Sequence, residues 1–230
     1  MSWTKPPGTQ VRGTRLLSTS VIAAAIGLLW PVASGLAQTA PAKPDLARAQ
    51  TIVNQTCVAC HGTDGNSPSP LNPSLAGMPA EYITVQLMHF KAGIRVNPVM
   101  QGMAQPLTPE DMKLLGLYFS QQKPKGLAAK NADLVKAGQK LYRGGDGATG
   151  VPACAACHAP DGSGVPKNYP RLAGQYPEYS YAQLKAFKNG ERGADKEGKD
   201  VNGKIMATIA GRMTDAQMKA VADYMAGLHN

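Results

Sequence analysis

The chain has 230 residues, with 24 basic and 15 acidic side chains and a formal net charge of +9 at pH 7. That length suits one large domain or two small ones. The basic excess is spread out, without an arginine-rich run or a neighbouring aromatic platform, so the composition argues against a nucleic-acid-binding function. We expect most of the lysines to be solvated, with a few available to steer a docking partner.

Residues 1–37 have the pattern of a secretory signal peptide. Three basic residues precede an apolar run from 16 to 37 without an acidic residue, and Gly35 and Ala37 stand where a cut after Ala37 needs small residues. The alternative is an uncleaved membrane anchor, because the run is about long enough to span a bilayer. Serines, a threonine and a proline interrupt it, however. We expect the remaining chain to be exported to the periplasm, either soluble or membrane-tethered. Because the leader holds three basic and no acidic residues, that remaining chain carries a net charge of +6.

All of the cysteines fall in two C-x-x-C-H motifs, which are Cys57, Cys60 and His61, and Cys154, Cys157 and His158. This motif is typical of covalent c-type haem attachment, in which the thiols add to the two vinyl groups and the histidine becomes the proximal iron ligand. A thioredoxin-like redox pair or half of a zinc site shares the C-x-x-C spacing. The histidine directly after both motifs, together with export, favours two covalently attached haem c groups.

The chain repeats itself at an offset of 97 residues. Besides the motifs, identical residues recur at this offset along the chain. The matches are Asp64-Gly65 and Asp161-Gly162, Pro73 and Pro170, Leu75-Ala76-Gly77 and Leu172-Ala173-Gly174, Gln86-Leu87 and Gln183-Leu184, Phe90 and Phe187, and Arg95 and Arg192. Beyond them the offset grows to 106, and the extra residues fall in a Gly- and charge-rich segment, 193–203, which we expect to be a solvated loop. The repeat predicts a first half over 38–122, a linker over 123–131 and a second half over 132–230.

Three helices are predicted around the motif in each half. In the first half, Asp45 is expected to cap the first helix, the second helix covers 79–93, and Thr108 caps the third. In the second half, the corresponding features are Asp133, 177–190 and Thr214. Aspartate and threonine are good N-caps, and proline at the start with glycine at the end suits the boundaries of the middle helix. The fold is therefore predicted to be all-α. Each half is small and poor in large aromatic residues, so a covalent porphyrin would supply much of its apolar core.

The histidines outside the motifs are poor candidates for a second axial ligand. His89 matches Ala186 in the other half, and His229 lies one residue from the C-terminus. Neither has a counterpart in the repeat, so we expect both to be ordinary helix or surface residues.

Methionine is the better candidate, and two methionine positions occur in both halves. Met112 and Met218 lie inside the third helix, where we expect core packing. Met100 and Met206 lie eight residues before the cap threonine, in expected loops that can present sulfur to iron. Met103 is set aside because it matches an isoleucine. We therefore expect Met100 and His61 to ligate one iron, and Met206 and His158 the other.

Thioether sulfur favours Fe(II), so histidine–methionine ligation raises the reduction potential relative to two histidines. With both axial positions filled, dioxygen and peroxide bind poorly. Such a site transfers single electrons, and two copies predict a two-centre electron carrier rather than an enzyme.

The paired C-x-x-C-H motifs, the D-G and P-x-L-A-G segments and M-x-G-M before a threonine cap resemble the dihaem cytochrome c4 family over about residues 44–229. The resemblance implies two tandem class I cytochrome c domains, each wrapped around one covalent haem. It also implies a periplasmic carrier between a quinol-oxidising complex, such as quinol–cytochrome c reductase, and a haem–copper terminal oxidase. Some members are membrane-attached.

Four further residue roles follow from the resemblance. The carbonyl oxygens of Pro73 and Pro170 are expected to accept the Nδ1–H of the proximal histidines. Arg95 and Arg192 are candidates for hydrogen bonds to the haem propionates, the alternative being simple surface charge.

Two other functions remain open. A dihaem electron-transfer subunit of a periplasmic dehydrogenase, such as a sulfide-oxidising flavocytochrome, would have a similar fold. A dihaem peroxidase or thiosulfate dehydrogenase would need an open iron, or a cysteine or second histidine as ligand. The sequence offers no spare cysteine for that role.

Overall fold

A computed structural model describes residues 46–195 and 197–229. The predicted leader and Asp45 lie outside the described residues. Within them the chain is helical, and the only strand-like pairings are the isolated bridges Asp146–Val151 and Val165–Tyr169. None of the described helices is long and apolar enough to cross a membrane. The predicted all-α fold is confirmed.

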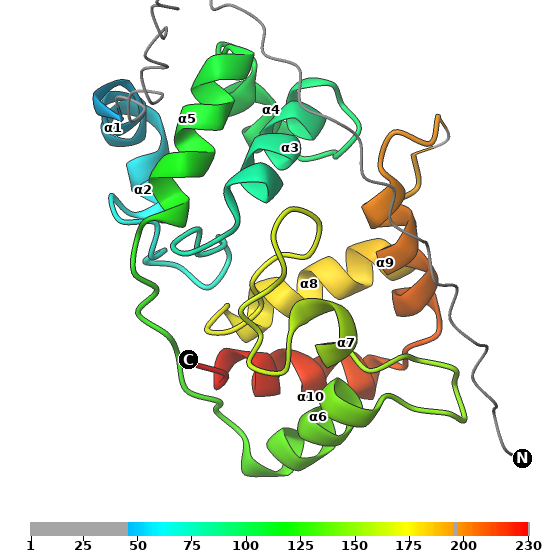
Figure 1. The fold of residues 1–230 in the computed structure, drawn as a ribbon. Helices are drawn as coiled ribbons and strands as arrows, with labels where there is room; N and C mark the ends of the chain where they lie inside the picture. Colours follow the sequence, from blue (N-terminus) through cyan, green and yellow to red (C-terminus); the bar gives the residue numbers. More distant parts are fainter. Residues whose placement is uncertain (1–45, 196, 230) are drawn as a thin grey trace, which may run out of the picture. The chain divides into compact units, whose positions relative to one another are not determined.

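The described residues of the first half form five α-helices, drawn in blue to green in Figure 1. Their bounds are α1 Ala47–Ile52, α2 Val58–His61, α3 Ala80–Lys91, α4 Pro98–Ala104 and α5 Pro109–Ser120. A π-helical turn over Val53–Cys57 joins α1 to α2 and thus leads directly into the first attachment motif.

The second half repeats this order, in green to red in Figure 1. Its helices are α6 Ala132–Gly144, α7 Ala155–His158, α8 Pro177–Lys188, α9 Val201–Gly211 and α10 Asp215–Ala226. The cap predicted for α6 is wrong. Asn131 is the cap, and its side chain accepts from the backbone N–H groups of Asp133 and Leu134.

The caps of the last helix in each half are as predicted. The Thr108 hydroxyl accepts from the backbone N–H of Asp111, and the Thr214 hydroxyl accepts from that of Gln217. The Asp111 and Gln217 side chains reach back to the threonine N–H groups, which completes a capping box in both halves. A capping box depends only on residues three positions apart, so the sequence predicts it independently of the tertiary structure.

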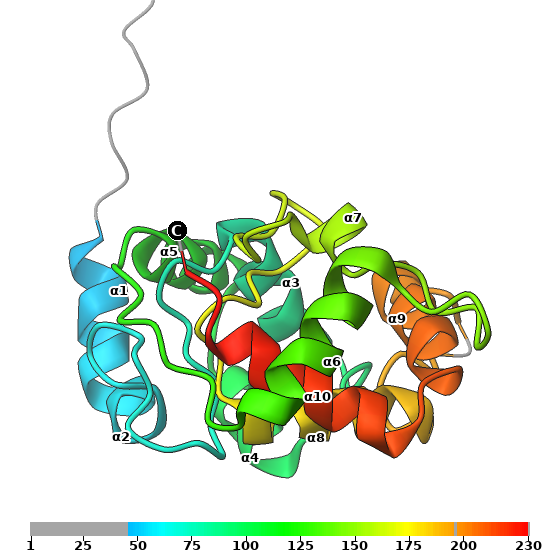
Figure 2. The ribbon, with the colours of Figure 1, turned by 90° about the horizontal axis from the view of Figure 1, so that it is seen from below.

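Each half has its own hydrophobic core. Met112 is 1% exposed in the first core and Met218 is 2% exposed in the second, so the predicted core role of both is confirmed. The core helices cross closely at a glycine in each half. An added Cβ on Gly116 of α5 would lie 2.3 Å from the Ala80 carbonyl oxygen of α3. In the second half, α6 crosses α10 at Gly138 (Figure 2).

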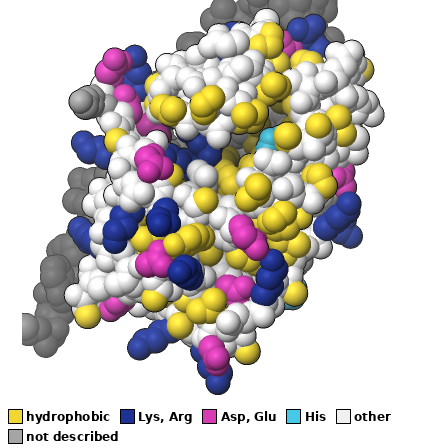
Figure 3. Space-filling view, turned by 180° about the vertical axis from the view of Figure 1, so that it is seen from behind, with side chains coloured by type: hydrophobic (Ala, Val, Ile, Leu, Met, Phe, Trp, Pro, Cys, Tyr) yellow, Lys and Arg dark blue, Asp and Glu magenta, His cyan; other side chains and the backbone are white. Residues whose placement is uncertain are grey.

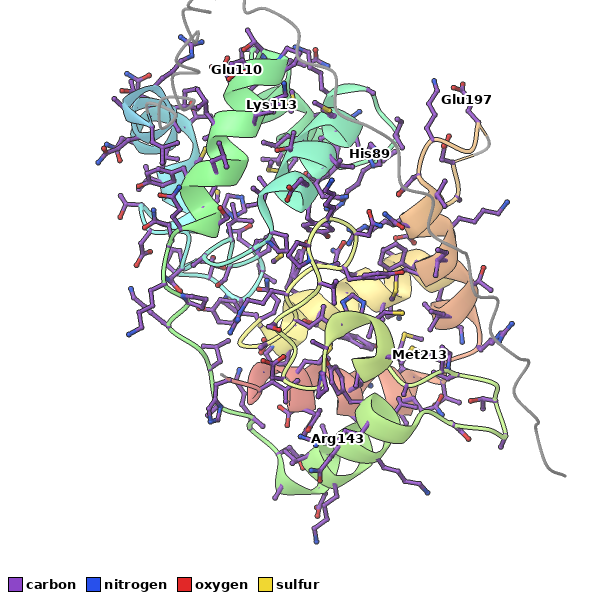
Figure 4. All side chains as sticks on the ribbon, in the orientation of Figure 1. His89, Glu110, Lys113, Arg143, Glu197 and Met213 are labelled. Carbon is purple, nitrogen blue, oxygen red and sulfur yellow. The ribbon has the colours of Figure 1, made fainter. Side chains whose placement is uncertain are left out.

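The 193–203 segment differs from the predicted solvated loop. Its middle is exposed, but Gly193, Asp200 and Gly203 are buried, and α9 begins inside it. The Asp200 side chain caps α9 by accepting from the Gly203 N–H at 2.9 Å. Asp200 Oδ2 also lies 3.9 Å from Nδ1 of His89, which is labelled on α3 in Figure 4. The segment therefore contacts the first half of the chain.

Candidate haem sites

The two attachment motifs lie on short helices, α2 and α7, with their thiols unpaired. The side chains of Cys57 and Cys154 are half-buried, and burial raises the pKa of each thiol to about 11. No disulfide pairs the cysteines of the motifs. This state suits thiols that are to form thioether bonds.

The histidines of the two motifs are buried and oriented alike. His61 is 7% exposed and His158 is 6% exposed. Their Nδ1 atoms lie 2.9 Å from the carbonyl oxygens of Pro73 and Pro170, respectively. Because a carbonyl only accepts, each Nδ1 carries the proton and each Nε2 keeps its electron pair for a metal. Burial lowers the pKa of both imidazoles, which further favours the neutral form that can bind iron.

The two candidate methionine ligands were predicted to lie in loops, and this prediction is wrong. Both lie in helices. Met100 lies in α4, which begins at Pro98 and is capped by the Asn97 side chain. Met206 lies in α9 and packs against the core of the second half. Both are half-buried, whereas Met103 is 42% exposed. Both thioethers therefore lie on helices, α4 and α9, and their matching positions in the repeat remain the reason for choosing them as ligand candidates.

Arg95 is buried at the contact between the two halves, so it is not simple surface charge. It is 9% exposed, and Nη1 donates to Gln86 Oε1 at 2.7 Å. Its Nη2 donates across to the second half, to the Tyr179 hydroxyl at 3.0 Å and to Gln183 Oε1 at 2.9 Å. The guanidinium also stacks over the Phe90 ring, 4.6 Å from the ring centre.

Arg192 makes the reciprocal contacts and is also 9% exposed. Its Nη1 donates to Gln183 Oε1 at 2.7 Å, and Nη2 donates to the Tyr82 hydroxyl at 2.9 Å and to Gln86 Oε1 at 3.2 Å. It stacks over Phe187 at 4.4 Å.

We call these eight residues the arginine network; they are Tyr82, Gln86, Phe90 and Arg95 with Tyr179, Gln183, Phe187 and Arg192. Every pair is related by the offset of 97 residues. Three of these pairs were found among the matching positions of the repeat, whereas the pair Tyr82 and Tyr179 was overlooked. Applying the same offset to Tyr82 gives Tyr179, which is the signal that was missed.

The residues present fit two haem groups. Each half offers two thiols, a buried imidazole with Nε2 available and a half-buried thioether. The arginine network adds two buried cations whose hydrogen-bond partners are neutral hydroxyl and amide groups. Buried charge of one sign is costly without compensating charge. The Asp200 carboxylate interacts with Arg95, and the carboxylates of a haem would supply further negative charge. Figure 3 shows apolar side chains gathered around a hollow on one face, with a histidine side chain beside it.

Comparison with known proteins gives the same assignment for each half. Residues 135–229 match the family model described as cytochrome c. Residues 44–118 match the family model described as cytochrome c oxidase, cbb3-type, subunit III. Each match includes one C-x-x-C-H motif.

Whole-chain relatives extend the assignment to the pair of halves. The thiosulfate dehydrogenase electron acceptor of Thiomonas intermedia (strain K12) is 43% identical over 174 residues, which are 74% of this chain and 77% of that protein. Cytochrome c4 of Azotobacter vinelandii is 39% identical over 183 residues, 75% of this chain and 84% of that protein.

A solved structure of reduced recombinant cytochrome c4 from Pseudomonas stutzeri superposes with a TM-score of 0.72 at 37% identity, covering 81% of this chain and 100% of that one. Two cytochrome c domains with paired attachment motifs carry two covalent haem c groups, each of which supplies a one-electron Fe(III)/Fe(II) couple. The chain therefore belongs to the cytochrome c4 family and is a dihaem electron carrier.

Proposed function

We propose that the chain is a periplasmic carrier that passes single electrons from a quinol-oxidising complex to a terminal oxidase or another redox partner. In this proposal His61 and Met100 ligate one iron, and His158 and Met206 ligate the other. The observation that carries the proposal is the repetition of the site. Both halves hold a buried imidazole on a proline carbonyl at 2.9 Å, with a half-buried methionine on the helix that precedes the capping box.

The arginine network supports a role in which both centres work in one unit. Arg95 and Arg192 each reach across the contact between the halves and share Gln86 and Gln183. We propose that their remaining charge is balanced by the haem propionates. Such pairing would hold both haems at the contact between the two halves and keep their relative position constant during electron transfer.

The ligand assignment can be tested with Met100→Ala and Met206→Ala. In the unsubstituted protein we expect two low-spin haems, both with the weak sulfur-to-iron absorption band at the red end of the ferric spectrum. Each substitution should abolish that band for one haem and lower only that haem's midpoint potential, because the thioether favours Fe(II). A spectroelectrochemical titration measures both effects.

Met103→Ala is the matched control, because Met103 lies on the same helix as Met100 and is 42% exposed. It should leave band and potential in place. An unchanged spectrum after Met100→Ala or Met206→Ala would refute that ligand. A high-spin haem that binds cyanide rapidly in the unsubstituted protein would instead favour a dihaem enzyme. Mass measurement of the same sample would report haem number and a cut after Ala37.

A second candidate donor comes from the name of one relative. The Thiomonas intermedia protein is described as a thiosulfate dehydrogenase electron acceptor, so a periplasmic dehydrogenase is an alternative source of electrons. Stopped-flow reduction by quinol–cytochrome c reductase and by thiosulfate dehydrogenase would rank the two donors. Salt should slow whichever reaction is steered by surface charge. Co-purification of a flavoprotein would favour the flavocytochrome-type subunit.

A further inference from the structure

A second contact between the halves is made by Gln175, just before α8. Its side chain is buried, with the residue 6% exposed. The Gln175 Oε1 atom accepts from the backbone N–H of Ser74 at 2.9 Å, and its Nε2 donates to the carbonyl oxygen of Ser74 at 3.0 Å. One amide side chain therefore satisfies both backbone groups of a single residue in the other half.

Tyr176 extends this contact. Its hydroxyl donates to the carbonyl oxygen of Ser67 at 2.8 Å. Ser67 is itself tied to Ser74, because its N–H donates to the Ser74 hydroxyl at 3.3 Å. We call Gln175 and Tyr176 the cross-half clamp, since together they hold both ends of the 67–74 segment.

The clamped segment is the one that positions the proximal side of the first haem site. Ser74 follows Pro73 directly, and the carbonyl of Pro73 accepts from Nδ1 of His61 at 2.9 Å. At the other end, the Ser67 hydroxyl donates to the carbonyl oxygen of Cys60, the residue before His61, at 2.9 Å. The clamp thus contacts Ser74, which is next to the acceptor Pro73, and Ser67, which is hydrogen-bonded to the residue next to the donor His61.

The second half does not receive the same support from the first. The offset of 97 residues places Met78 and Pro79 opposite Gln175 and Tyr176, and neither side chain can donate a hydrogen bond. The corresponding segment of the second half, 164–171, has hydrogen bonds of its own. Val165 and Tyr169 form a backbone bridge there, and the Gly164 N–H donates to the His158 carbonyl at 3.0 Å.

We propose that Gln175 and Tyr176 are positioning residues through which the second half tunes the reduction potential of the haem in the first half. The inference rests on the proposed ligation of that haem by His61. A firm Nδ1–H to carbonyl hydrogen bond increases the basicity of the imidazole and stabilises Fe(III). Loosening the carbonyl should weaken that hydrogen bond and raise the midpoint potential of the first haem alone.

The test is Gln175→Met, which installs the residue that the first half carries at the matched position. We expect the midpoint potential of the first haem to rise and that of the second to stay unchanged in a spectroelectrochemical titration. We also expect the Ser74 amide hydrogen of the reduced protein to exchange about fivefold faster, because a hydrogen bond of ordinary strength is lost. Tyr176→Phe should shift the same potential in the same direction by a smaller amount.

The two haems can be distinguished by NMR, through the Nδ1–H signals of His61 and His158 in the reduced protein. Gln122→Met is the matched control, because the Gln122 amide donates within the first half, to the Tyr118 carbonyl at 3.0 Å. It should move neither potential.

An unchanged or lowered potential for the first haem after Gln175→Met would overturn the proposal, and so would an equal shift of both potentials, which would mean that the residue only holds the halves together. Failure of the ligation itself would be recognised separately, by loss of the red absorption band in the unsubstituted protein.

Discussion

The two halves share one helix arrangement but place their glycines at different crossings. In the first half the glycine is Gly116, where α5 meets α3, and an added Cβ would lie 2.3 Å from a backbone oxygen. In the second half the glycine is Gly138, where α6 meets α10, and the corresponding distance is 2.2 Å. Two buried residues with small side chains are Ala49 of α1 and Ala222 of α10.

The positions of the two glycines show that a different pair of helices comes into backbone contact in each half. Helices approach most closely where no Cβ separates them, and the chain has used that freedom once per half. Around Gly138 the aromatic rings of Tyr142 and Tyr224 close the crossing, with their centres 5.5 Å apart. The common fold therefore leaves open which pair of helices forms the tightest contact.

The largest predicted effects follow from filling these two contacts. Gly138→Ala would place a methyl group 2.2 Å from the Ala220 carbonyl oxygen, and Gly116→Ala would place one 2.3 Å from that of Ala80. Because backbone atoms cannot turn aside, each substitution should lower the free energy of unfolding by about 1–3 kcal/mol, as overpacking does. Denaturant unfolding of the holoprotein, followed by far-UV circular dichroism, measures the change.

Two buried alanines of the same helix bundles are the controls, Ala49 of α1 and Ala222 of α10. Ala49→Gly and Ala222→Gly remove a methyl group and add backbone freedom, so each should cost about 1 kcal/mol. If Gly138→Ala or Gly116→Ala stabilised the protein instead, the glycines would be tolerated rather than required at these crossings.

The capping boxes give a second comparison between the halves. In the first half the capping carboxylate of Asp111 also pairs with the guanidinium of Arg48, with Arg48 Nη2 3.0 Å from Oδ2. In the second half the capping amide of Gln217 donates to Asp146 Oδ2 at 2.7 Å. One cap thus anchors α1 through a titratable group, and the other anchors the loop after α6 through an amide that does not titrate.

The difference predicts that acid weakens the first cap directly. Hydrogen bonds from Arg48, and then those from Thr108, hold the pKa of the buried Asp111 carboxyl well below its usual range. A depressed folded-state pKa contributes stability above the unfolded value of about 3.9, and that stability is lost as the pH falls through the folded value. Asp111→Asn should cost about 1–2 kcal/mol at pH 7 and reduce the loss of stability below pH 4.

Gln217→Asn is the matched change at the second cap. It should shorten the reach to Asp146 and lower stability, but it should change the acid profile less than Asp111→Asn does, because hydrogen bonds from Thr149 and Ala148 contribute more than Gln217 to the lowered pKa of Asp146. Unfolding curves for the two variants and the parent protein between pH 5 and pH 2 make the comparison. Identical acid profiles for Asp111→Asn and the parent would contradict the assigned role of Asp111.

The sequence predicted those features that depend on a few neighbouring residues or on the repeat. The threonine caps are three-residue patterns, and the buried positions of Met112 and Met218 follow from helical spacing. The helices that carry Met100 and Met206 were taken for loops, although Asn97 and Pro98 form a cap and first-turn signal before one of them.

Contacts between the halves could not be predicted in the same way. Arg95 bonds to residues 84 and 88 positions away in the sequence. Such pairing depends on how two domains meet, which no local pattern encodes. The repeat helps with the arginine network, whose members match, but it hides the cross-half clamp, where Gln175 stands opposite a methionine. A difference between repeats thus identifies a contact that one half makes and the other does not.

The smallest predicted effect concerns His89, which matches Ala186 in the other half. His89 is 9% exposed, and its Nδ1 has no hydrogen-bond partner among the described residues. Burial lowers its pKa; the charges facing it are the carboxylates of Asp200 and Asp195, which oppose the shift, and the guanidinium groups of Arg95 and Arg192, which add to it.

A folded-state pKa below the unfolded value of about 6.5 means that the unfolded chain binds more protons, so stability should fall as the pH drops below that value. Replacing His89 with alanine, the residue of the matched position, should reduce the difference in unfolding midpoint between pH 7.5 and pH 5. A parent protein that gains stability in this window would show that Asp200 pairs with a protonated His89 and that its carboxylate outweighs burial.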